Sequence, residues 1–361
     1  MRRRARSFLP STAVVELTYR CNHRCIYCSC PWDADGRGFE RLGELTTAEW
    51  KDALSLLCSK GVCNLAFTGG EALLRSDALE IMEYAASLEA EHVSTVDGEL
   101  QSTTGPPKIY LLSNGVPVTE DVLRFCAGHG IRLSLSLPGL STFEYHTGFD
   151  HSALVLEKFA LAERMGVGTT ANITVTKRNL PELRKTISAA LLAGAGQVLL
   201  NRFLPGGRGL SSAQDLRLDA SQLQEMLRTA DDVLTKAGRK GSMGTEMPVC
   251  ITGGMEFRTL NVSTRCSAAI KFFVVGPSGY VRVCNHSEQR LAHVGEWEKL
   301  RDDPYWRSFV MKRYMPGECS DCRERLGCDA GCREAAHIAG GRLDALDPAV
   351  DGDLVESYSL K

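Results

Sequence analysis

The sequence has no long hydrophobic run, no strong excess of one charge and no internal repeat. Each absence narrows the range of functions that the protein could have. No apolar stretch approaches the ~20 residues that a membrane-spanning helix needs. The Arg-rich start (Arg2, Arg3, Arg4 and Arg6) lacks the apolar segment of a secretory signal peptide, so we expect a cytoplasmic protein with no membrane partner. A net charge of −2 over 361 residues gives no basic surface for nucleic acid.

Cysteine, in contrast, is abundant, with 14 residues in the chain. Disulfides are rare in the reducing cytoplasm, so metal binding is the better explanation. Four cysteines lie in the segment 21–30 and seven in the segment 250–332. The remaining three, Cys58, Cys63 and Cys126, fall in apolar helix or strand patterns, and we expect them to be buried as small hydrophobic side chains.

Residues 12–203 alternate between strand and helix patterns. One predicted helix begins at the capping box Thr46-x-x-Glu49, and a long predicted helix covers Asp219–Gly238. Repeated strand–helix units predict a parallel sheet with right-handed crossovers, here an α/β fold of the partial (β/α)6, TIM-like barrel type. The predicted strands are short and mostly apolar: Thr12–Thr18, Val62–Phe67, Lys108–Ser113, Ile131–Leu137, Gly168–Thr176 and Gln197–Phe203.

Two further segments divide the chain. The polar stretch Glu89–Pro107 has no periodicity, and we expect a surface loop inserted between a helix and a strand. Gly241–Thr245 is a candidate hinge, after which the sequence becomes short segments punctuated by cysteine. We therefore predict a barrel domain over residues 12–240 and a small cysteine-rich domain over residues 246–345.

The first cysteine group is a C-x3-C-x2-C loop formed by Cys21, Cys25 and Cys28, directly after the first predicted strand. Three thiolates on one tight loop can hold three corners of a four-iron cubane, which leaves one iron without a protein ligand. An iron of this kind can bind a small molecule.

Polar motifs follow the next strands: Thr68-Gly69-Gly70-Glu71, Ser113-Asn114-Gly115 and Ser136-Leu137-Pro138-Gly139. Each alone is a common turn sequence. In barrels of parallel strands, however, the chemistry sits at the C-terminal ends of the strands. Together with the cysteine loop, the motifs resemble those of the radical S-adenosylmethionine (SAM) enzymes.

The resemblance implies a [4Fe–4S] cluster on Cys21, Cys25 and Cys28 that binds SAM, receives an electron from an external flavodoxin or ferredoxin, and yields a 5′-deoxyadenosyl radical. The Gly69-Gly70-Glu71 motif would contact the methionine amino group, and Ser113 and Ser136 would lie near the ribose and carboxylate. The full set of cofactor-binding residues implied is Tyr27, Gly69, Gly70, Glu71, Ser113, Asn114, Ser136, Asn172, Thr174 and Leu204.

The second cysteine group is similar to the SPASM extension of some radical SAM enzymes. Its pattern is Cys266-x12-Gly279-x4-Cys284 followed by Cys319-x2-Cys322-x5-Cys328-x3-Cys332. The resemblance implies two auxiliary iron–sulfur clusters, one on Cys266, Cys284 and Cys332 with Cys250 as the available fourth ligand, and one on Cys319, Cys322 and Cys328.

The second of these clusters lacks a fourth cysteine, because none follows Cys332. An open iron or a non-cysteine ligand is expected there, with Asp347, Asp351 and His337 as the nearby candidates. A zinc ribbon that pairs Cys319 and Cys322 with Cys328 and Cys332 is the structural alternative.

Three residues near the barrel mouth have two interpretations each. Cys30 is either a hydrogen-atom donor in catalysis or a thiol in the pocket wall. Arg202 and Arg208, after the sixth strand, either bind a substrate carboxylate or belong to a charged surface loop.

Auxiliary clusters give an electron a route away from the substrate, so the resemblance favours oxidation or crosslinking of a ribosomally made peptide. A dehydrogenase of a small molecule, such as an aminosugar, amino acid or tetrapyrrole, is the main alternative, and a non-catalytic electron carrier or zinc-stabilised binding protein is another. Sulfatase maturases carry an acidic base where this chain has Asn285, which disfavours that branch. The few residues before the first strand leave no room for a leader-binding module, so we expect a separate partner or the barrel itself to bind a leader peptide.

Overall fold

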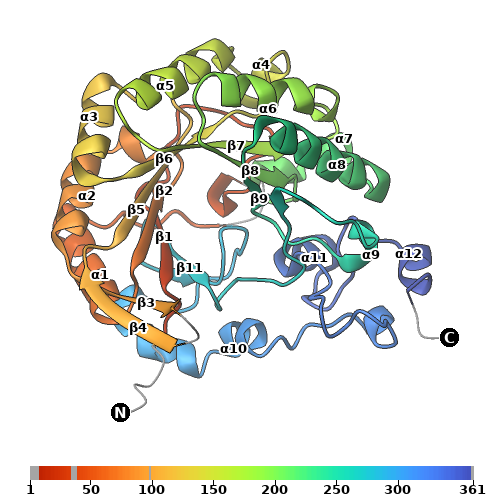
Figure 1. The fold of residues 1–361 in the computed structure, drawn as a ribbon. Helices are drawn as coiled ribbons and strands as arrows, with labels where there is room; N and C mark the ends of the chain where they lie inside the picture. The colour runs from red at the N-terminus through yellow and green to blue at the C-terminus, as the bar shows by residue number, and fades with distance from the viewer. Residues whose placement is uncertain (1–7, 34–38, 97–98, 359–361) are drawn as a thin grey trace.

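The computed structural model describes residues 8–33, 39–96 and 99–358, and one ten-stranded sheet organises them (Figure 1). Six strands lie side by side, parallel and in chain order, as the sequence predicts. The α/β barrel prediction is therefore confirmed. These strands are β1 (Thr12–Glu16), β2 (Asn64–Thr68), β5 (Lys108–Ser113), β6 (Arg132–Ser136), β7 (Thr169–Val175) and β8 (Gln197–Arg202).

Helices cover the outer face of the curved sheet (Figure 1). The predicted caps are present: Thr46 and Glu49 form the capping box of α1, and Asp219 forms one with Gln222 at the start of α8. The buried Cys58, Cys63 and Cys126 belong to the apolar core, as expected. The helices of this part are α1 (Thr47–Ser59), α2 (Ala78–Ser87), α3 (Glu120–His129), α4 (Phe143–Thr147), α5 (Ser152–Arg164), α6 (Leu183–Leu192), α7 (Ala213–Leu216) and α8 (Ala220–Ala237).

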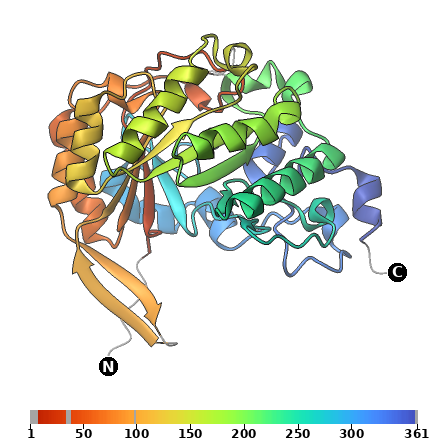
Figure 2. The same ribbon diagram turned by 45° about the horizontal axis from the view of Figure 1, so that its top comes forward.

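The predicted surface loop at 89–107 is instead a β-hairpin that projects from the body of the molecule (Figure 2). Its strands, β3 (Ala90–Val96) and β4 (Glu99–Gly105), pair antiparallel along their whole length. The loop prediction failed because the hairpin buries neither face in the core, so its strands lack the apolar alternation by which strands are recognised. Leu100, for example, is 77% exposed.

The C-terminal part continues the same sheet at both ends. The candidate hinge at 241–245 contains a strand, β9 (Gly241–Met243), which pairs with β8, and β11 (Phe272–Val275) pairs with β1. One apolar core runs from Trp50 of α1 to Phe273 of β11. The other elements are α9 (Val249–Thr252), β10 (Leu260–Asn261), β12 (Val281–Arg282), α10 (Pro304–Val310), α11 (Arg333–Gly340) and α12 (Gly352–Glu356).

Two predictions from the sequence concern the Arg-rich start of the chain and the absence of a membrane-spanning helix. The Arg-rich start lies outside the described residues. Among the helices that are described, none is both long and apolar enough to cross a membrane.

Candidate functional site

A cavity of about 430 Å³ lies at the C-terminal ends of the parallel strands. Its volume falls within the ~300–1,000 Å³ of pockets that bind small molecules and cofactors. Cys21, Cys25, Cys28 and Cys30 line it together with all ten predicted cofactor-binding residues: Tyr27, Gly69, Gly70, Glu71, Ser113, Asn114, Ser136, Asn172, Thr174 and Leu204. The structure thus brings residues at the ends of six parallel strands to one cavity.

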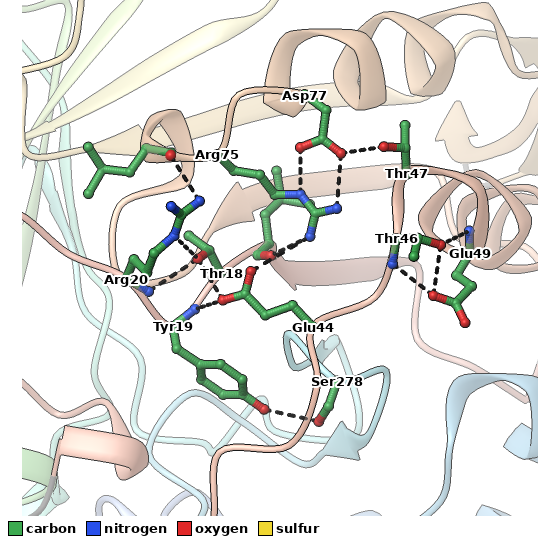
Figure 3. Close-up of polar contacts among 12 residues, drawn as sticks. Thr18, Tyr19, Arg20, Glu44, Thr46, Thr47, Glu49, Arg75, Asp77 and Ser278 are labelled. Carbon is green, nitrogen blue, oxygen red and sulfur yellow. Dashed lines mark hydrogen bonds and ion pairs between the residues drawn. The ribbon is translucent and has the colours of Figure 1, made fainter.

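A polar network fixes the chain between β1 and the cysteine loop, residues 21–28 (Figure 3). Arg75 donates to both carboxylate oxygens of Asp77, at 2.7 and 2.9 Å, and these bonds lower the pKa of Asp77 to about 2. Arg75 also lies 3.9 Å from Glu44, which accepts a hydrogen bond from the backbone N–H of Tyr19 (2.8 Å). The Tyr19 hydroxyl in turn reaches Ser278 at 3.1 Å, so the network ties this segment to the C-terminal part.

The loop after β8 packs directly on the cysteine loop. Arg208 donates to the carbonyl oxygen of Cys25 (3.3 Å) and to the carboxylate of Asp33 (3.1 Å). A Cβ on Gly207, which has φ +49°, would lie 2.4 Å from the carbonyl oxygen of Cys30, so the close approach requires glycine. Arg208 therefore holds the cysteine loop in place, rather than projecting from a surface loop.

The three thiols of the loop are crowded. Burial raises the pKa of Cys25, and the charges of Cys28 and Cys21 raise it further. Burial likewise raises the pKa of Cys21 to about 11. Three thiolates in this space repel one another unless a cationic centre lies between them, and a [4Fe–4S] cluster is such a centre. The donor set therefore fits the cluster that the sequence predicts.

Cys30 lies in the same cavity as the loop cysteines. A hydrogen bond between Cys28 and Cys30 lowers the pKa of Cys28 and raises that of Cys30, so Cys30 is the protonated donor of the pair. Its sulfur is 4.0 Å from the carbonyl oxygen of Gly69. The placement is compatible with both interpretations of this thiol.

The Gly-Gly-Glu motif joins two strand ends. A Cβ on Gly70 would lie 2.2 Å from the carbonyl oxygen of Arg20, so only glycine allows this approach. Glu71 is 2% exposed and accepts hydrogen bonds from the backbone N–H of Asn114 (2.8 Å) and the hydroxyl of Ser113 (3.1 Å). These contacts fix the ends of β2 and β5 relative to each other, while binding of SAM by Glu71 and Ser113 stays a prediction.

The burial of Glu71 makes stability depend on pH. It raises the pKa of this carboxyl group from 4.5 to about 7. Between these values the folded chain keeps a proton that the unfolded chain releases, so stability falls as pH rises, by up to about 3 kcal/mol. We expect Glu71→Gln to remove this part of the pH dependence, as measured by urea unfolding of the iron-free chain at about pH 5 and about pH 8. If the free energy of unfolding changes between these pH values by the same amount in wild type and in Glu71→Gln, the prediction is wrong.

Several polar residues of the cavity were not identified from the sequence. Glu16, at the end of β1, forms a buried ion pair with Arg282 of β12. Asn201 donates to the side-chain oxygen of Asn172 at 2.9 Å. Glu16 and Asn201 lie near the C-terminal ends of predicted strands, which is a local signal, but the pairing of Glu16 with Arg282 joins positions far apart in sequence. Glu246, His286 and Glu334 also line the cavity.

The cysteines of the C-terminal part form two sets. The proximal set, Cys266, Cys284 and Cys332, lines the large cavity, and the charge of Cys332 raises the pKa of the other two thiols. The distal set, Cys250, Cys319, Cys322 and Cys328, lines a second cavity. The structure thus places Cys250 away from the set in which the sequence predicted it.

This division also separates the four cysteines of the zinc-ribbon alternative, since Cys332 lies in the proximal set. Within the described ranges, no three His, Cys, Asp or Glu side chains converge in the manner required for a single metal ion. A cubane presents separate irons to separate thiolates, so its ligands need no such convergence.

The non-cysteine candidates for the second cluster have other roles. Asp347 forms a buried ion pair with Arg202, at 2.8 and 2.5 Å, and accepts the backbone N–H of Cys332. Asp351 caps α12 through the backbone N–H of Leu354 (2.8 Å). His337 contacts the hydroxyl of Tyr305 at 3.0 Å. The pair with Asp347 also shows that Arg202 is not a surface group. Arg202 lines the large cavity, so binding of a substrate carboxylate by its guanidinium stays a prediction.

Comparison with known proteins identifies close parallels in sequence. Residues 15–190 match the Radical SAM superfamily. The mycofactocin maturase MftC of Mycobacterium tuberculosis (strain H37Rv) is 27% identical, over 92% of this chain and 81% of that protein. The PqqA peptide cyclase of Gluconobacter oxydans (strain 621H) is 25% identical, over 94% of this chain and 90% of that protein.

Solved structures share the fold. Streptococcus suis SuiB bound to its precursor peptide SuiA aligns with a TM-score of 0.68 at 13% identity, over 94% of this chain and 75% of that chain. Native anSMEcpe with bound AdoMet aligns with a TM-score of 0.69 at 17% identity, over 96% of this chain and 94% of that chain. The fold, the cavity and the superfamily match agree, and residues 15–190 are a radical SAM domain, which makes the chain a radical SAM enzyme.

Proposed function

We propose that this enzyme oxidises or crosslinks a peptide by radical SAM chemistry. The observation that carries the proposal is the single cavity in which the cysteine loop, the polar strand ends and the proximal set face one another. A substrate in this space would lie between the place where SAM is cleaved and a second metal site. The relatives named as a maturase and a peptide cyclase support a peptide as the substrate.

The residues present fit a cofactor at each end of the cavity. Cys21, Cys25 and Cys28 would hold the [4Fe–4S] cluster, whose reduction by an external flavodoxin or ferredoxin supplies a 5′-deoxyadenosyl radical when SAM is bound. The proximal set would hold an auxiliary cluster that accepts an electron from the substrate. Burial, and in addition the charges of neighbouring thiolates, raise the pKa of Cys25 in the first set and of Cys284 in the second, so a cationic centre at either place would stabilise the thiolate form.

The protein itself would orient SAM and the substrate and exclude water from the cavity. Gly69 and Gly70 allow the backbone after β2 to pack closely on the backbone of Thr18 and Arg20, which follow β1. The buried Glu71 fixes the neighbouring end of β5. Asn172 of β7 and Asn201 of the adjacent strand β8 present a hydrogen-bonded amide pair to the same cavity. These groups would position SAM and one segment of a peptide, while a leader sequence would be bound elsewhere or by a partner protein.

The test uses the full chain, reconstituted with iron and sulfide without oxygen and reduced with dithionite. We expect SAM to be cleaved to 5′-deoxyadenosine, and a short peptide encoded beside the gene to lose hydrogen atoms or gain an internal crosslink, as measured by mass spectrometry. Cleavage of SAM with no change in any such peptide, but with oxidation of an amino acid or aminosugar, would replace the peptide proposal with the small-molecule alternative.

A further inference from the structure

We propose that Cys250 is the fourth ligand of an iron–sulfur cluster bound by Cys319, Cys322 and Cys328. The inference rests on the proposed function only in taking the C-terminal cysteines as cluster ligands. It gives the distal cluster four cysteines and leaves the proximal cluster with three.

The first argument is the position of Cys250 in the fold. It lies on the single turn α9, which starts after Pro248 and ends at Gly253 in the left-handed conformation (φ +58°). The backbone N–H of Val249, the first residue of this turn, donates to the sulfur of Cys328 at 3.4 Å. The turn therefore sits against the distal set, with its own cysteine next to the contact.

The second argument is the lining of the two cavities. Cys250 shares a cavity with Cys319, Cys322 and Cys328 and with no member of the proximal set. That cavity is small, about 30 Å³, against about 430 Å³ for the large one. The proximal cysteines line the large cavity instead, where Cys250 is absent from the lining.

The distal cavity is closed by the C-terminal helix α12, from which Val355 lines it together with Tyr358 just beyond the helix. The backbone N–H of Arg323 donates to the carbonyl oxygen of Tyr358 at 3.1 Å, and the Arg323 guanidinium lies 4.9 Å from the Tyr358 ring. Asp347 also borders the cavity, but its carboxylate is engaged by Arg202.

The assignment changes where an open coordination position lies. The sequence pattern predicted it at the distal cluster, whose three cysteines had no downstream partner. With Cys250 in the distal set, the proximal cluster would be the one with three cysteine ligands, and all three line the large cavity.

The test measures bound iron in pairs of variants. In a chain carrying Cys266→Ala and Cys284→Ala, adding Cys250→Ala is expected to remove the distal cluster, about four iron atoms per chain, and its EPR signal. In a chain carrying Cys319→Ala and Cys322→Ala, the distal cluster is already lost. Adding Cys250→Ala to this chain is expected to change neither the bound iron nor the EPR signal. If adding Cys250→Ala removes iron from the second chain and not from the first, Cys250 belongs to the proximal cluster and the proposal is wrong.

Cys126→Ala is the matched control, because Cys126 is a buried thiol in α3 remote from both sets. It is expected to leave the iron content unchanged in both backgrounds. If a cysteine variant fails to fold, oxidation of the wild-type chain after iron removal gives a second measurement. Disulfides mapped by mass spectrometry are expected to join Cys250 to the distal cysteines, and a link to the proximal set would contradict the assignment. Neither measurement needs SAM or a peptide, so failure of the proposed function would be seen separately.

Discussion

Replacement of Cys25 by Ala is expected to abolish the cleavage of SAM. The cysteine loop offers three thiols to a cluster, and Cys25 is the central one, with a pKa raised by burial and by both neighbouring thiols. With two thiols left, a cubane would have two irons without protein ligands and would be lost from the loop. The measurement is the yield of 5′-deoxyadenosine per chain under dithionite, which should fall to the background of the reaction without enzyme.

Two controls make this result specific. Cys126→Ala should retain the wild-type yield, because that thiol lies in the core away from the cavity. The iron content of the Cys25→Ala chain should fall by about one cluster and no more, since the two C-terminal sets are intact. Undiminished 5′-deoxyadenosine formation in the variant would remove the assignment of the cysteine loop.

The second large effect concerns stability. Asp347→Ala is expected to lower the free energy of unfolding by about 3–5 kcal/mol, because it leaves the guanidinium of Arg202 buried without its partner. The two side chains are 0% and 3% exposed, and the carboxylate also accepts the backbone N–H groups of Cys332 and Ala349. Urea unfolding of the iron-free chain measures the loss.

The matched control replaces both partners. The double variant Arg202→Met with Asp347→Leu leaves no buried charge unpaired, so it should be more stable than Asp347→Ala, although the backbone N–H groups of Cys332 and Ala349 still lose their acceptor. Asp347→Ala should also be worse than Arg202→Met, since only the aspartate serves backbone N–H groups as well. Equal stability of Asp347→Ala and wild type would show that the pair contributes nothing.

Much of the barrel and of its site could be predicted because the signals are local. Each strand of the barrel is a short apolar run, and each polar motif at the cavity follows such a run directly, as Ser113 follows Leu112. Parallel strands align their C-terminal ends, so knowing the strands was enough to bring Gly69, Ser113 and Asn172 to one cavity.

The features that could not be predicted depend on contacts between distant segments. The resemblance placed Cys250 with the proximal set, but α9 packs on Cys328 through the backbone N–H of Val249, and Cys250 lines the distal cavity. The ion pairs of Glu16 with Arg282 and of Arg202 with Asp347 join residues more than 140 positions apart, and neither pair has a local signature. The strand β9 is three residues long, too short for a periodicity to show.

The pairing of β11 with β1 has a consequence for electron transfer. The two strands run parallel, with Thr12 opposite Phe272 and Val15 opposite Val275. Cys21 follows β1, and Cys266 and Cys284 bracket β11 and β12, so the cysteine loop and two members of the proximal set are attached to neighbouring strands of one sheet. The separation between these cysteines is set by a strand register, which the buried side chains hold against slippage. If both sets hold the clusters proposed above, the tunnelling distance between the clusters is fixed when the sheet forms.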